Sequence, residues 1–280
     1  MGLFISVKTS YTPPDMKILV FGDIVNNIGV RAVKTVLPRL IDTHRPDLVI
    51  ANAENLAGGK GITPEILQDL LHAGVDFFTS GNHVFAKKQA FDVFSDAKLS
   101  EKIIRPANYP AGVPGVGAKM LSVGAKNVLV INLLGRVHGP VLCDDPFRRL
   151  DEILKEFAHQ RPSVILVDFH AEATSEKVAF GWHCDGRTTA MWGTHTHVPT
   201  RDERVLPGGT AYITDVGMTG MRDGVIGVDK EAILRNFTTS LPVKHEYADS
   251  GDAIVNALLI DTDGLGKASS ITHYQEIVHI

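Results

Sequence analysis

Two histidines separated by one residue stand in the segment 193–197, directly after the apolar residues 190–192. In an extended backbone, side chains two positions apart point to the same face, so the imidazoles of His195 and His197 can meet at one point. Imidazole is a good ligand for zinc and iron. An isolated pair of this kind is more often one packed and one solvated histidine. The pair therefore needs further ligands elsewhere in the chain before it predicts a metal site.

Other polar residues with metal-binding chemistry follow four apolar runs of the chain. They are Asp23 after 18–22, Glu54 and Asn55 after 48–53, Asn82 and His83 after 75–80, and His170 after 164–169. The carboxyl ends of strands in an α/β sheet are where ligands and catalytic groups collect. Together with the histidine pair, these groups are numerous enough to hold two divalent metals, which would clamp the attacking and leaving oxygens of a phosphoryl displacement.

The elements that must position these residues alternate between strands and helices. Thr63 is expected as the N-cap of a helix, with Pro64 at its first position. The expected order is strand 17–22, helix 30–44, strand 48–53 and helix 63–73. Such an order predicts a parallel sheet with helices packed on it.

The second half of the chain continues the alternation and adds many short strands. A long loop is expected at 106–117 and a hairpin of strands 118–123 and 128–133. A helix at 146–159 and a strand at 164–169 follow. Short strands then follow at 203–206, 210–214, 242–247, 253–261 and 269–278, with one helix at 230–237. Both halves therefore contribute strands, which predicts an α/β fold of two packed sheets flanked by helices. We expect a single domain over 16–280, preceded by an extension, residues 1–15, that need not be fully ordered.

Composition indicates a globular protein without an affinity for long nucleic acid. Of 280 residues, 44% are hydrophobic and 21% are charged, close to the average of soluble domains. The formal net charge of −4 gives no basic footprint for gripping phosphate backbones. A small nucleotide or phosphodiester remains a suitable partner, and a homo-oligomer is compatible with the sequence.

Cysteine usage and hydropathy point to a cytoplasmic setting. The chain has 2 cysteines, Cys143 and Cys184, too few and too far apart for a disulfide framework. No apolar run reaches the roughly 18 residues that a membrane span needs. The first residues lack the charged start and apolar stretch of a signal peptide. We therefore expect a cytoplasmic protein that does not interact with membranes.

The motifs together resemble the calcineurin-like metallophosphoesterase superfamily. That superfamily has an Asp after the first strand, a bridging carboxylate, a Gly-Asn-His, a single His and a Gly-His-x-His. More closely, the chain is similar to the YmdB-type bacterial phosphodiesterases, from about Met16 to the C-terminus. The stretches that carry this likeness are 21–23, 51–55, 80–83, 105–110, 167–177, 193–198 and 207–220. The resemblance implies a four-layer α/β/β/α sandwich of two mixed sheets flanked by helices.

Two departures from the superfamily pattern sharpen the assignment to this branch. The superfamily has Asp-x-His after the first strand, whereas here Val25, which cannot ligate, stands at the third position. The bridging carboxylate is usually Asp, and here it is Glu54. Asn55 directly follows, and its amide oxygen can replace the missing imidazole. Both departures resemble those of the YmdB-type branch.

The resemblance implies two metal ions, divalent or trivalent, and assigns their ligands. Iron or manganese is favoured and zinc is possible, because the donor set contains imidazole, carboxylate and amide oxygen but no thiolate. The implied ligands are Asp23, Asn55 and His197 on the first metal, Asn82, His170 and His195 on the second, and Glu54 bridging both.

The resemblance also implies the reaction. A hydroxide between the metals would attack a phosphodiester, with a 2′,3′-cyclic nucleotide as the favoured substrate, while His83 protonates the leaving oxygen as general acid. A phosphomonoesterase or protein phosphatase on the same fold is the nearest alternative, because the same hydroxide attacks either substrate. A regulatory protein that binds a nucleotide with little turnover is a second alternative. A purely structural metal site is disfavoured by the scarcity of cysteine.

Overall fold

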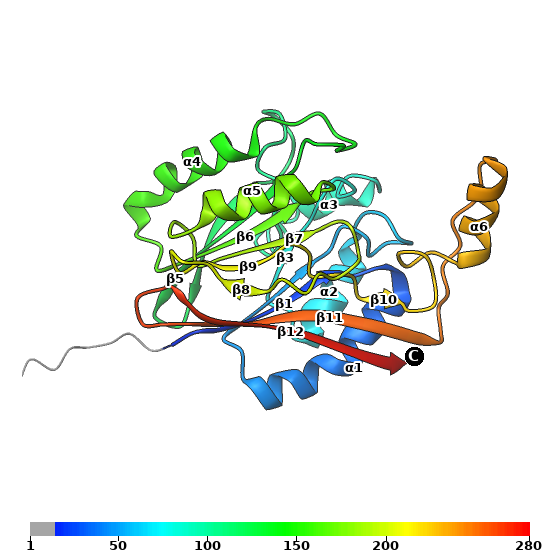
Figure 1. The fold of residues 1–280 in the computed structure, drawn as a ribbon, viewed down its shortest axis with the longest axis horizontal. Coiled ribbons are helices and arrows are strands. Elements are labelled where there is room, and N and C mark those ends of the chain that lie inside the picture. The colour runs from blue at the N-terminus through cyan, green and yellow to red at the C-terminus, as the bar shows by residue number, and fades with distance from the viewer. Residues whose placement is uncertain (1–14) are drawn as a thin grey trace, which may run out of the picture.

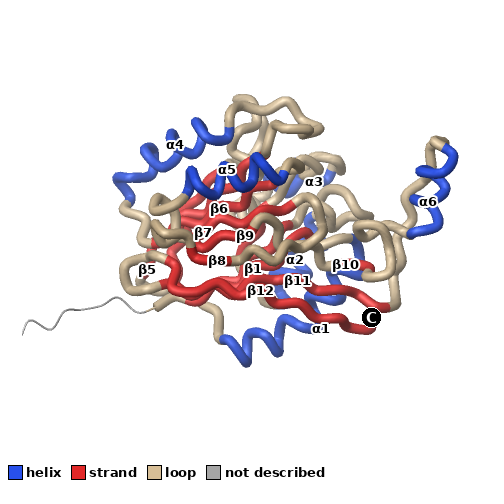
Figure 2. The backbone as a smooth tube through the Cα atoms, in the orientation of Figure 1, coloured by secondary structure: helices blue, strands red, loops and turns tan. Residues whose placement is uncertain are grey.

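The computed structural model describes residues 15–280 and contains two six-stranded mixed sheets that lie between helices (Figures 1 and 2). The prediction about the N-terminal extension falls on residues 1–14, which lie outside the described residues. Among residues 15–280, no helix has the length and apolar character needed to cross a bilayer.

The first sheet has the order β10-β11-β1-β2-β3, with β12 also paired to β11. Strands β1, β2 and β3 are parallel, and β11 joins β1 antiparallel. The bounds are β1 Lys17–Asp23, β2 Leu48–Asn52, β3 Phe77–Thr79, β10 Gly220–Met221, β11 Asp252–Thr262 and β12 Ala268–His279.

The second sheet has the order β4-β5-β6-β7-β9-β8. Its central strands β5, β6, β7 and β9 are parallel, while β4 and β8 pair antiparallel at its edges. The predicted hairpin is therefore confirmed as β4 and β5. The bounds are β4 Ala118–Val123, β5 Lys126–Leu134, β6 Val164–His170, β7 Ala190–Thr194, β8 Arg204–Val205 and β9 Ala211–Ile213.

Alternation along the buried strands builds three apolar layers. In β1, Leu19 and Phe21 face a core shared with helices, whereas Ile18 and Val20 face the core between the two sheets. Because both faces are buried, the strand reads as a continuous apolar run rather than an alternating one. Trp192 of β7 packs into the same central core from the second sheet.

Helices complete the outer layers on both sides, which confirms the predicted four-layer α/β/β/α sandwich. Apolar residues of α1, α2 and α3 pack on the first sheet, and those of α4 and α5 pack on the second. Helix α6 projects away from these layers (Figure 1). The bounds are α1 Asn26–His44, α2 Pro64–Ala73, α3 Gln89–Ser95, α4 Pro146–Phe157, α5 Thr174–Cys184 and α6 Lys230–Thr239, with a 3₁₀ turn at Ala158–Gln160.

One predicted strand was wrong and several boundaries moved. Residues 242–247 form no strand and run as irregular, mostly exposed chain between α6 and β11. Helix α1 begins at Asn26, not at residue 30, and the elements α3, α5 and β10 were not predicted. The predicted cap of α2 is confirmed, since the Thr63 hydroxyl oxygen accepts a hydrogen bond from the Ile66 amide at 3.5 Å.

Candidate metal centre

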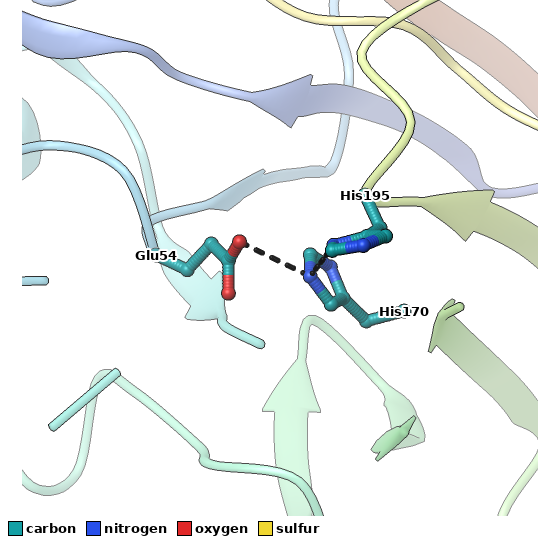
Figure 3. Close-up of side chains that lie close together, drawn as sticks. All are labelled: Glu54, His170 and His195. Atoms are coloured by element: carbon teal, nitrogen blue, oxygen red, sulfur yellow. Dashed lines mark hydrogen bonds and ion pairs between the residues drawn. The ribbon is translucent and has the colours of Figure 1, made fainter. Parts of the chain in front are cut away.

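The carboxyl ends of strands from both sheets meet at one edge of the sandwich. Asp23 ends β1 and His170 ends β6, while Glu54 and His195 lie in the loops that follow β2 and β7. Figure 3 shows Glu54 reaching from its loop toward the two histidines, whose rings lie against each other. The facing sheets thus bring together residues that are far apart in the sequence.

Three other potential metal ligands converge on the ring of His170. Its Nε2 lies 3.1 Å from Glu54 Oε1, 3.1 Å from Asn82 Oδ1 and 3.0 Å from Nδ1 of His195. One ligand atom from each of Glu54, His170 and His195 lies within 4.8 Å of the others, a spacing that could hold a metal ion. Glu54 and His170 are buried and His195 is partly buried.

Burial and neighbouring charges shift the pKa values of the residues in this group. Burial alone would lower the pKa of His170, but the carboxylates of Glu54, Asp23 and Asp168 together outweigh burial and raise that pKa to about 9. Burial would raise the pKa of Glu54, yet His170 and His83 together outweigh burial and lower it to about 2. Burial, with His170 beside it, lowers the pKa of His195 to about 3. His195 is therefore neutral at pH 7, as a metal ligand must be, and a bound cation would replace the proton of His170.

Two buried oxygens at the site have no hydrogen-bond partner among residues 15–280. Asp23 accepts the backbone N–H of His195 through Oδ2 at 3.1 Å, but its Oδ1 has no such bond. Asn55 donates from its side-chain amide to Gly59 O at 3.0 Å, and its Oδ1 is also without a donor. A buried oxygen left in this way costs about 1–3 kcal/mol. A cation would satisfy both oxygens, so the residues present fit a metal centre.

His197 is oriented by its backbone surroundings. Its Nδ1 lies 2.9 Å from the carbonyl oxygen of Ile226, so a proton on Nδ1 donates there and leaves Nε2 free for a ligand. His195 and His197 have φ of 95° and 65°, in the left-handed region that side-chain-bearing residues rarely adopt. Conformations of this kind persist only where surrounding structure holds them.

A buried ion pair holds the loop that carries both histidines. Lys177 Nζ lies 2.6 Å from Asp215 Oδ2, and both side chains are 1% exposed. The same Oδ2 accepts the hydroxyl of Thr196 at 2.7 Å, while Asp215 Oδ1 accepts the amide of Gly217 at 2.8 Å. Sequence reasoning missed this pair, because nothing in the chain links a lysine to an aspartate that lies 38 positions away.

His83 stands at the pocket that opens beside the metal ligands. Its backbone N–H donates to Glu54 Oε2 at 2.9 Å, and its side chain is half-buried. Burial is the main cause that lowers its pKa, and the ammonium of Lys60 adds to the effect. The pocket has a volume of about 310 Å³, within the range of small-molecule sites.

The structure places every predicted site residue at this edge, but at different distances. Glu54 and His195 belong both to the tight group around His170 and to the lining of the pocket. Asn55, His83 and His197 line the pocket but lie outside that group. The pocket also has walls that the sequence did not reveal, including Lys60, Glu172, His245 and Tyr247. Of these, Glu172 contacts His195 Nε2 at 3.0 Å, and its place two residues after His170 was the available signal.

Curated proteins of similar sequence include a named phosphodiesterase. A protein of Bacillus subtilis (strain 168), named 2′,3′-cyclic-nucleotide 2′-phosphodiesterase, is 48% identical over 252 residues, which cover 90% of this chain and 93% of the relative.

Solved structures agree with the fold. A hypothetical protein from Thermus thermophilus superposes with a TM-score of 0.87 at 41% identity, covering 94% of this chain and 99% of that one. A structure described as a novel phosphatase from Mycoplasma pneumoniae gives a TM-score of 0.88 at 32% identity, covering 95% and 94%. The family model described as YmdB-like protein matches residues 19–274, which confirms the resemblance seen in the motifs: the chain belongs to the YmdB-like protein family.

Proposed function

We propose that this protein is a phosphodiesterase that hydrolyses 2′,3′-cyclic nucleotides at a site for two metal ions. The observation that carries the proposal is the convergence of oxygen and imidazole donors at one edge of the sandwich, including the Oδ1 atoms of Asp23 and Asn55, which accept no hydrogen bond from residues 15–280. The substrate class is supported by the name of the Bacillus subtilis relative, which is 48% identical to this chain over 252 residues.

The ligands divide between two positions in this proposal. Asn82, His170 and His195 form one set, because Nε2 of His170 faces both partners at 3.0–3.1 Å. The second set is Asp23, Asn55 and His197, with Glu54 between the two. Such ions, when bound, neutralise phosphate charge and lower the pKa of a nearby water. Iron or manganese suits these nitrogen and oxygen donors, and zinc is also compatible.

His83 supplies the proton that the leaving group needs. Water delivers its oxygen to phosphorus and releases one proton to solvent, the bond from phosphorus to O2′ breaks, and protonated His83 gives its proton to O2′ and regains one from solvent. The product is a 3′-monophosphate. The hydrogen bond from the His83 amide to Glu54 holds this histidine at the edge of the ligand group. A positioned acid of this kind contributes roughly 10²–10⁴-fold in rate.

The test combines metal analysis with a substrate panel. Purified protein is analysed for bound metals and assayed with bis-p-nitrophenyl phosphate, p-nitrophenyl phosphate and 2′,3′-cAMP. We expect two metals per chain and a preference for the two diesters. A strong preference for the monoester would assign the protein as a phosphomonoesterase instead. Tight binding of the cyclic nucleotide without turnover would assign it as a regulatory binder.

A further inference from the structure

One wall of the pocket beside the metal ligands is built from two segments that meet at Gly59. A Cβ atom at Gly59 would lie 2.1 Å from ring atoms of Tyr247, so the ring packs directly against this glycine, whose φ is 81°. The carbonyl oxygen of Gly59 accepts the side-chain amide of Asn55 at 3.0 Å. Tyr247 is therefore separated from a proposed metal ligand by a single residue, although it comes from the irregular chain before β11.

The pocket continues past Tyr247 into a second hollow of about 450 Å³. Lys60, His245 and Tyr247 line both spaces, and Lys87 lines the second one. The Lys87 stem packs on the same glycine-rich loop, since a Cβ at Gly61 would lie 2.8 Å from Lys87 Cγ. Lys60 thus stands between the pocket of the metal ligands and the second hollow, and Lys87 lies at the far end, in the second hollow alone.

The charge of this far end is positive and not neutralised. Within residues 15–280, the lysine ion pairs are Lys34 with Asp69, Lys119 with Glu101 and Lys177 with Asp215, so Lys60 and Lys87 form none. The two carboxylates that line the pocket, Glu54 and Glu172, each contact a histidine of the metal group. Negative charge in the pocket is therefore concentrated at the proposed metal ligands, and the second hollow is lined by two lysines that have no carboxylate partner among residues 15–280.

We propose that this end of the depression is a second subsite, in which Tyr247 contacts the base and Lys60 and Lys87 bind a phosphate on the 5′ oxygen of the same nucleotide. The inference rests on the proposed function, because it takes the cyclic phosphate to lie at the metals. The 5′ carbon leaves the ribose away from the 2′ and 3′ oxygens, so a 5′ phosphate points toward the far end. The preferred substrate is then a 5′-phosphorylated 2′,3′-cyclic nucleotide, either free or as the end of an oligonucleotide.

The kinetic test compares three substrates on the metal-loaded protein: 2′,3′-cAMP, the same compound with a 5′-phosphate, and a dinucleotide that ends in a 2′,3′-cyclic phosphate. We expect kcat/KM to rise about tenfold when the 5′ phosphate is present, which corresponds to about 1.4 kcal/mol. Preference for the 5′-phosphorylated 2′,3′-cAMP over the dinucleotide would identify the substrate as a free nucleotide. The reverse preference would identify it as the end of an RNA. Equal rates on all three would overturn the proposal.

Substitutions locate the effect. In Lys60→Met and Lys87→Met the ratio of rates with and without the 5′ phosphate should fall toward one. Lys88→Met is the matched control, because Lys88 is exposed, adjacent in sequence and lines neither space, and its ratio should stay that of the unmodified protein. Raised salt should weaken the preference, since screening reduces attraction at exposed lysines. If the ratio of rates with and without the 5′ phosphate is unchanged in both Lys60→Met and Lys87→Met, the assignment of the phosphate to these lysines is refuted.

A binding measurement separates this proposal from the proposed function. Calorimetry compares 3′-AMP, the expected product, with adenosine 3′,5′-bisphosphate, and we expect about tenfold tighter binding of the bisphosphate. Tyr247→Leu should weaken both ligands about tenfold, while Tyr247→Phe should retain their affinity because its ring still stacks on a base. If no diester is hydrolysed yet the bisphosphate is preferred, the catalytic proposal fails and the subsite stands. Equal affinity for both ligands, with normal turnover, overturns the subsite alone.

Discussion

The side-chain amide of Asn52 donates a 3.0 Å hydrogen bond to Oδ2 of Asp168 and so joins the two sheets directly beneath the metal ligands. Asn52 ends β2, whereas Asp168 lies in β6 of the facing sheet. Thr79 of β3 donates to the same carboxylate oxygen at 2.5 Å, and the other oxygen accepts the hydroxyl of Thr194 at 2.6 Å. All four side chains are buried. The network therefore fixes the relative position of the two halves of the ligand set.

Thr194 connects this network to a ligand, which predicts a loss of metal affinity when its hydroxyl is removed. His170 Nδ1 lies 2.9 Å from Thr194 Oγ1, so the ring can donate to the hydroxyl while Nε2 faces the other ligands. Removing such an orienting partner typically weakens metal binding by 10–100-fold. We expect this loss in Thr194→Val, measured by competition with a chelator. Thr194→Ser keeps the hydroxyl and should bind metal normally; equal affinity of both variants would contradict the orienting role.

Much of the site could be predicted because its residues follow apolar strands. Asp23 and His170 lie at the ends of runs that read as buried strands, and Asn82 follows such a run after Gly81. Since parallel strands bring their carboxyl ends to one edge, local pattern was sufficient to place these groups together. The supporting network was not predictable in the same way. Asn52 and Asp168 read as polar interruptions of strands, and only the packing of the two sheets reveals that they face each other.

There are physical reasons why some elements and boundaries could not be predicted from the sequence. Helix α5 lacks a clear apolar stripe, because it buries the polar side chains of Glu176 and Lys177 as well as Phe180. The first turn of α1 contains Gly29, a poor helix former that is required here because a Cβ would lie 2.3 Å from Thr219 O. The residues 242–247 alternate like a strand, but no neighbouring strand pairs with them, and they form a wall of the pocket instead.

Position 81 requires a glycine, because two of the proposed metal ligands occupy the space that a side chain would fill. A Cβ at this position would lie 2.2 Å from Glu54 Oε2 and 2.4 Å from His170 Nε2. We expect Gly81→Ala to displace both side chains and to lose bound metal, as measured by elemental analysis, while circular dichroism shows that the fold persists. Gly124→Ala is the control, because no atom lies within 4 Å of its Cβ position. Its φ of 57° costs about 1–2 kcal/mol of stability, but its metal content should not change. Normal metal content in Gly81→Ala would refute the steric account.

Lys177 is predicted to contribute strongly to stability through its buried partner. Removing one member of a buried ion pair leaves an uncompensated charge and typically costs about 3–5 kcal/mol. We expect Lys177→Met to lose about this much free energy of unfolding in denaturant titrations. The double variant Lys177→Met with Asp215→Asn should recover part of the loss, because the amide carries no charge. Lys34→Met is the comparison: its pair with Asp69 is exposed and should contribute at most about 1 kcal/mol.

His197 is predicted to control the occupancy of one metal position. Val25 stands where the superfamily has a second histidine, so His197 is the only imidazole in the proposed set with Asp23 and Asn55. We expect His197→Ala to retain one metal per chain and to lose the other. His183→Ala is a suitable control, since that ring contacts Asp151 at the surface, away from the pocket. Two metals per chain in His197→Ala would refute the proposed partition.

His83 is predicted to act on the leaving group and not on the metals. His83→Ala should keep its metal content, because the contact with Glu54 is made by the backbone N–H and survives the substitution. Turnover of 2′,3′-cAMP should fall by roughly 10²–10⁴-fold. Turnover of bis-p-nitrophenyl phosphate should fall much less, since p-nitrophenolate is a stable anion that leaves without a proton. An equal loss on both substrates would show that His83 supports binding or metal geometry, and full activity on the cyclic nucleotide would exclude it as the acid.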